Sequence, residues 1–143
     1  MPLPPEDKST AVVVHALLIC RSAEAGPEGD LGVEGIVEIL PVESLPGDVG
    51  PLTFLALARN LPAGPGRGAF LVRTPGPDAR DIARCPLAVT VPKGYEGRQL
   101  ALQVRLPSLP VTQGGWYEVI FEWEGAALAA NRFAVGARGR GKK

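Results

Sequence analysis

The chain is poor in the residues that most often build reactive centres. It holds one histidine, His15, and two cysteines, Cys20 and Cys85, in 143 residues. Two thiols and one imidazole cannot complete a tetrahedral zinc site without a carboxylate. Two cysteines also make no disulfide framework, which predicts a reducing compartment and a cytoplasmic protein. We therefore expect neither a metal nor another cofactor.

Motifs of nucleophilic and phosphate chemistry are also missing. None of the four serines lies in a Gly-x-Ser-x-Gly sequence. The glycine-rich stretch 64–68 lacks the Gly-Lys-Ser/Thr ending of a phosphate-binding loop. We therefore predict a non-catalytic protein. The carboxylates Glu118, Glu122 and Glu124 keep a carboxylate-based hydrolase as the last-ranked alternative.

Long hydrophobic runs are absent as well. No run reaches the roughly 18 apolar residues of a membrane-spanning helix, so no membrane partner is expected. Residues 1–10 form an acidic, proline-rich arm without a basic leader, which argues against a secretory signal. The last residues, 137–143, form a basic, glycine-rich tail.

What is present is apolar sequence with a period of two, broken by turns. Apolar residues make up 45% of the chain, and 18 glycines and 15 prolines cluster between the apolar runs. The clearest run alternates Tyr117, Val119, Phe121 and Trp123 with polar residues, and Glu124-Gly125 follows it. This pattern predicts a strand with one buried face that enters a hairpin.

The same pattern predicts about eight short strands in one domain over residues 11–136. They cover 11–20, 31–40, 51–61, 68–74, 86–91, 98–106 and a final hairpin over 116–135. The segment 126–131 is helical on propensity alone, but the turn before it favours a bulged strand. Eight strands separated by turn residues indicate a two-layer antiparallel β-sandwich.

Two blocks of the chain carry a family resemblance. The first is the apolar strand 16–20 with 31–37, and the second runs from Leu106-Pro107 through Gly115-Trp116-Tyr117 into Phe133-x-Val135. Together they resemble small uncharacterised bacterial proteins, a domain of unknown function with an immunoglobulin-like β-sandwich. The resemblance implies a fold and no activity. Tyr117 fits a tyrosine corner and an ordinary core tyrosine equally well.

The leading functional hypothesis is a module that binds another protein, or a second copy of itself. Trp116 points opposite Tyr117 in a regular strand, so we expect it outside the main core. With Ile120, Leu55 and Leu57 it would form an apolar patch suited to a partner. The alternative is burial of these residues beneath a loop. Trp and Tyr on a sandwich face also leave carbohydrate binding open.

A second hypothesis is association with nucleic acid through the basic tail. Four cations would contact phosphates in a salt-dependent way, namely Arg138, Arg140, Lys142 and Lys143. The tail has no aromatic residue on which a base could stack. A solvated chain end explains the same residues.

The remaining reactive groups have structural interpretations. A half-buried, hydrogen-bonded His15 is favoured over a pH switch. Buried, inert thiols are favoured for both cysteines. Arg84 precedes Cys85 directly, and a neighbouring cation predicts a modestly lowered pKa for that thiol.

Overall fold

The structure is a computed structural model that describes residues 11–25, 30–74, 76–95 and 97–137. These residues form eleven β-strands and no helix, which confirms the predicted all-β class. With no helix in these ranges, none of them could cross a membrane as a helix. The strands are β1 (Val13–Ala25), β2 (Leu31–Ile36), β3 (Ile39–Val42), β4 (Gly47–Val49), β5 (Leu52–Arg59), β6 (Gly64–Arg73), β7 (Asp81–Val91), β8 (Gln99–Leu106), β9 (Leu109–Val111), β10 (Gly115–Trp123) and β11 (Ala126–Ala137).

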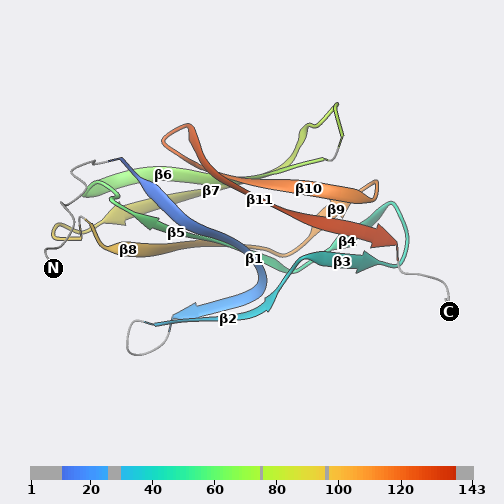
Figure 1. The fold of residues 1–143 in the computed structure, drawn as a ribbon, viewed down its shortest axis with the longest axis horizontal. Helices are drawn as coiled ribbons and strands as arrows, with labels where there is room; N and C mark the ends of the chain where they lie inside the picture. The colour runs from blue at the N-terminus through green and yellow to red at the C-terminus, as the bar shows by residue number, and fades with distance from the viewer. Residues whose placement is uncertain (1–10, 26–29, 75, 96, 138–143) are drawn as a thin grey trace, which may run out of the picture.

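The strands form two large sheets and one small one (Figure 1). The four-stranded sheet has the order β2-β1-β5-β8, and the five-stranded sheet has the order β3-β11-β10-β6-β7. A two-stranded sheet pairs β4 with β9. Neighbouring strands run antiparallel except β3 and β11, which are parallel. The prediction of purely antiparallel pairing is therefore wrong at this edge.

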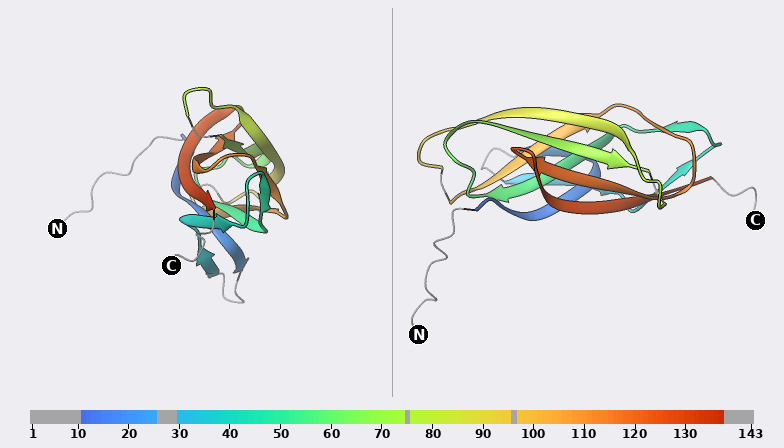
Figure 2. Two further views of the ribbon diagram at one scale, coloured as in Figure 1. Left: turned by 90° about the vertical axis from the view of Figure 1, so that its right-hand side faces the viewer. Right: turned by 90° about the horizontal axis from the view of Figure 1, so that it is seen from above.

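The main core lies between the two large sheets, which curl around it in the end-on view of Figure 2. Phe54 of β5 meets Phe70 of β6 with ring centroids 5.9 Å apart, and Phe70 meets Phe121 of β10 at 5.1 Å. Tyr117 stacks on Phe133 of β11 at 5.7 Å. Aromatic contacts thus join both sheets and tie the final hairpin to the core.

The C-terminal hairpin forms as the sequence predicts. Glu124 and Gly125 take φ values of 50° and 85°, and the favoured two-residue hairpin turn needs positive φ at both positions. The register of β10 and β11 shifts after Phe121, which is the expected bulge. Strand pairing across 126–131 excludes the helical alternative for this segment.

The predicted strand 31–40 is two strands in different sheets. The Val37 backbone N–H donates to the carbonyl of Ile19 in the four-stranded sheet at 2.7 Å. The next carbonyl, of Glu38, accepts from Ala134 N–H in the five-stranded sheet at 2.8 Å. The chain thus changes sheets between these two residues. Val37 packs against the core, whereas Ile39 lies on the outer surface.

Other strand ends also differ from prediction. β1 continues to Ala25 through a segment expected as loop, because its second half pairs with β2. Strand β6 starts at Gly64 and β7 at Asp81, since the two pair over nearly their whole length. The short strands β4 and β9 fall in segments expected as connections. The described residues therefore form eleven strands where about eight were predicted.

Candidate functional site

The outer face of the five-stranded sheet carries the strongest candidate surface. Along β10, Tyr117, Val119 and Phe121 belong to the main core, and the alternation turns Trp116 and Ile120 to the opposite face. Trp116 is exposed, as predicted. The two ends of this outer face differ in how their apolar residues are covered.

At one end an apolar row stays open. Trp116 on β10 pairs with Ala134 on β11, and Ala134 pairs with Ile39 on β3. Trp116 is 44% exposed and Ile39 is 62% exposed. The guanidinium of Arg132 lies over the indole ring, 4.6 Å from its centroid. We call Trp116, Ala134 and Ile39 the open row; it is an apolar strip beside a cation–π contact.

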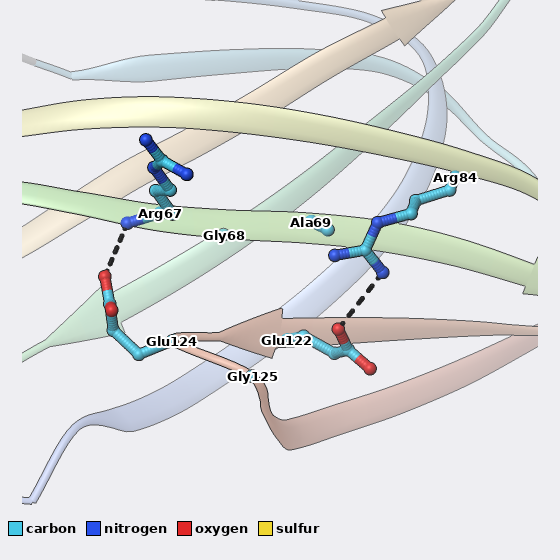
Figure 3. Close-up of a pocket in the computed structure, with 7 residues that line it drawn as sticks. All are labelled: Arg67, Gly68, Ala69, Arg84, Glu122, Glu124 and Gly125. Atoms are coloured by element: carbon cyan, nitrogen blue, oxygen red, sulfur yellow. Dashed lines mark hydrogen bonds and ion pairs between the residues drawn. The ribbon is translucent and has the colours of Figure 1, made fainter.

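At the other end the apolar residues are covered. Ala69, Leu71 and Ile120 are buried in a small cluster separate from the main core. Arg84 reaches from β7 across β6 to Glu122 on β10, with a 3.3 Å ion pair (Figure 3). We call this cluster with its ion pair the covered end. The alkyl part of a long cationic side chain can shield apolar surface from water, and Arg84 lines the same groove as Ala69.

The covered end borders a groove of about 260 Å³ that contains Arg67, Arg84, Glu122 and Glu124 (Figure 3). Glu124 accepts a hydrogen bond from the backbone N–H of Arg67 at 2.7 Å, and its own N–H donates to the Arg67 carbonyl at 2.8 Å. Glu122 is held by Arg84. Each carboxylate in the groove thus already has a protein partner, and these contacts fasten the hairpin turn to β6.

The predicted four-residue patch does not assemble. Ile120 is 7% exposed because it lies in the covered end, next to Leu71. Leu55 is 0% exposed and Leu57 is half-buried, and both belong to β5 in the four-stranded sheet. Of the four residues only Trp116 is exposed, and its surface neighbours are residues the sequence did not single out. Ile39 was missed because the sheet change before it reverses the face on which it lies.

His15 is exposed rather than half-buried. The Arg59 Nε–H donates to His15 Nε2 at 3.2 Å, so the expected hydrogen bond is present. Arg59 also donates from Nη1 to the Gly97 carbonyl at 2.6 Å. His15 therefore helps to position Arg59 across two strands.

The two cysteines are free and buried, as expected for inert thiols. Burial raises the pKa of the Cys20 thiol and that of Cys85. The predicted lowering of the Cys85 pKa by Arg84 is wrong, because Arg84 extends over the outer face while Cys85 packs into the core. Within the described ranges no three His, Cys, Asp or Glu side chains gather into a metal site.

The remaining predicted contacts involve Tyr117 and the chain ends. The Tyr117 hydroxyl donates to the Gln113 carbonyl at 2.6 Å, which is the backbone bond expected of a tyrosine corner.

The predicted polyanion contacts lie outside the described residues: Arg138, Arg140, Lys142 and Lys143. The acidic arm 1–10 lies outside them too.

No protein-family model matches the sequence, and no curated protein matches it. The resemblance to bacterial sandwich domains therefore stays a prediction from the sequence.

Proposed function

We propose that this chain is a non-catalytic protein-binding module with an immunoglobulin-like β-sandwich, which binds its partner through the open row. The observation that carries this proposal is the exposure of Trp116 and Ile39 in one row across three strands. Adjacent apolar side chains left open to water on a regular sheet are typical of an interaction surface.

The strand order supports the immunoglobulin-like part of the proposal. If β5, β6, β7, β8, β10 and β11 correspond to strands B, C, C′, E, F and G, then B and E share one sheet, and C′, C, F and G share the other in that order. Tyr117 on β10 makes the bond of a tyrosine corner at the start of strand F. The chain departs from antibody domains at Val119, two residues later, where those domains have a disulfide cysteine.

The chemistry around the open row favours a protein over a sugar. Tryptophan and arginine are enriched among the residues that dominate protein–protein binding. Arg132 already lies over the indole ring of Trp116, and a sugar would need to stack on that ring. Glu118 and Arg132, both exposed, occupy the neighbouring positions on β10 and β11. They would form a polar rim next to the apolar strip.

Affinity capture with matched variants tests the proposal. The bait is the full chain, as wild type, as Trp116→Ser, as Ile39→Ser and as Val13→Ser. Val13 is an exposed apolar residue of the other sheet, 39% exposed, so it controls for a general loss of surface hydrophobicity. We expect a protein captured by the wild type and by Val13→Ser to be lost with both other variants.

The affinity of that protein is then measured by titration calorimetry. Loss of one central aromatic contact predicts at least about a 30-fold weaker Kd for Trp116→Ser. Equal capture by Trp116→Ser and wild type would overturn the proposal. Binding of oligosaccharides that depends on Trp116 would replace it with carbohydrate recognition.

A further inference from the structure

The two large sheets have four edge strands, β2, β8, β3 and β7. An edge strand presents unpaired backbone N–H and C=O groups and can pair with another chain. Proteins usually block such edges with proline, bulges, short length or charge. The four edges of this protein differ in these respects.

Three of the edges carry blocking features. β3 spans only Ile39–Val42 and includes Pro41. β7 contains Pro86 and has a register shift against β6 near Arg73. β2 contains Gly32 and Gly35, and Gly35 takes a φ of 66°. Each of these features makes a regular ladder with a further strand unfavourable.

The fourth edge, β8, carries one charge and none of the other blocking features. It pairs with β5 at every residue from Gln99 to Leu106 without a register shift. It contains no proline, glycine or lysine, and its single charged residue is Arg105. Within the described part of the chain no strand pairs with its other side. This edge is therefore a regular template for one more antiparallel strand.

The side chains of β8 also remain incompletely covered. Leu100, Val104 and Leu106 pack against the main core but are only half-buried, whereas Leu102 is buried. The alternate residues Ala101 and Gln103 are exposed on the outer face. A strand added here would cover both rows if it alternated apolar and small polar residues in the same way.

We propose that the strand added to this edge is β8 of a second copy of the chain, paired antiparallel about a two-fold axis. Opposed residues of an antiparallel pair lie on the same face, so core-facing residues meet core-facing residues. If Leu102 or Gln103 lies on the two-fold axis, opposite the same residue of the second copy, most residues of the two β8 strands are paired. These two registers place Arg105 opposite Gln99 or Ala101 of the second copy, so no two arginines meet. Such an interface is isologous, which is the commonest form of homodimer.

Added charge of one sign tests the pairing. The test variant carries both Ala101→Lys and Gln103→Lys. In the register centred on Leu102, each new lysine lies opposite a lysine of the second copy. In the register centred on Gln103, the lysine at 103 lies opposite the same lysine of the second copy and the lysine at 101 lies opposite Arg105, so like charges repel in both registers. The matched control is Ala88→Lys with Thr90→Lys, which adds the same charge at exposed positions of the proline-containing edge β7. Molar mass is measured by light scattering after size exclusion across a range of protein concentrations, and far-UV circular dichroism checks the fold.

We expect wild type and the β7 variant to reach twice the 15.0 kDa monomer mass. The dimer of the β8 variant should have a dissociation constant at least about tenfold higher than that of the wild-type dimer. Trp116→Ser should leave the dimer intact, so failure here is distinct from failure of the proposed partner surface. A wild type that stays at 15.0 kDa, or a dimer unaffected by the β8 charges, would overturn the proposal.

Discussion

At the two ends of the outer face of the five-stranded sheet, the same type of apolar residue is buried at one end and exposed to solvent at the other. Ile120 and Ile39 are the same residue type on the same face of one sheet. Ile120 is 7% exposed and Ile39 is 62% exposed. Ile120 lies on the central strand β10, between Leu71 on β6 and Ala130 on β11, whereas Ile39 lies on the edge strand β3. The ion pair between Arg84 and Glu122 also lies at the covered end.

At the open row the corresponding bridge is missing. Arg132 and Glu118 face each other on β11 and β10, yet the ion pairs among the described residues do not include them. Arg132 lies over Trp116 instead. The open row therefore differs from the covered end both in its place at the sheet edge and in the placement of its cation. A structural role for the covered end and a binding role for the open row predict different responses to the same substitution.

The largest expected effect comes from shortening the two isoleucines in turn. Ile120→Ala removes a buried side chain and should cost about 2–4 kcal/mol of unfolding free energy. Ile39→Ala should change it by less than about 0.5 kcal/mol, because its side chain is mostly in water. Urea unfolding followed by tryptophan fluorescence measures both. Equal losses would mean that Ile39 is structural and that the open row is not a free surface.

The adjacent residues Trp116 and Tyr117 allow a second comparison across one strand. Tyr117→Phe removes the hydroxyl that donates to the Gln113 carbonyl, and should cost about 1–2 kcal/mol. Trp116→Phe on the outer face should stay within about 0.5 kcal/mol of wild type. Chemical unfolding monitored by circular dichroism compares the two, since one variant lacks an indole. A larger loss for Trp116→Phe would show that this ring supports the fold.

Removing the cover itself should have a smaller effect. Arg84→Ala breaks a partly exposed ion pair, so we expect a loss below about 1 kcal/mol. Part of that loss should disappear in 1 M salt, because salt screens exposed charges. The control is Arg67→Ala, since the described residues give the Arg67 guanidinium no ion pair although it borders the same groove. If both variants respond to salt alike, the Arg84 bridge does not stabilise the covered end.

The hairpin and several strands could be predicted from local sequence. Period-two alternation located β8 and β10, and an apolar run located β5, each to within a few residues; Glu124-Gly125 supplied the turn. The division of 31–40 between two sheets could not be found in this way. It depends on hydrogen bonds from Val37 to Ile19 and from Ala134 to Glu38, whose partners are distant in sequence.

The candidate surface was predictable only in part. Alternation along β10 was enough to place Trp116 outside the core. It also placed Ile120 there, but Ile120 is buried beside Leu71 on β6, a neighbour that no local pattern shows. Leu55 and Leu57 were grouped with Trp116 by hydrophobicity, whereas strand order puts them in the other sheet. Ile39 was absent from the prediction because its face depends on the change of sheet before it.

The narrowest expected effect, which is confined to alkaline pH, concerns Arg84 and Cys85, sequence neighbours on opposite faces of β7. Burial raises the pKa of the Cys85 thiol above its usual value of 9.0. Well below pH 9.0 the thiol is protonated in both folded and unfolded chains, so it adds no pH dependence there. Above that pH the unfolded chain loses its proton first, and stability should fall by up to about 1.4 kcal/mol per pH unit.

Urea unfolding of wild type and Cys85→Ala at pH 8 and pH 10 measures this contribution. The fall in stability between the two pH values should be smaller in Cys85→Ala, while Arg84→Ala should show the same fall as wild type. Lysines and tyrosines also titrate in this range, so only the difference between variants is informative. If Arg84→Ala enlarged the fall, the arginine would be favouring the thiolate in the folded chain. Proximity in sequence would then outweigh the placement of the two side chains on opposite faces of β7.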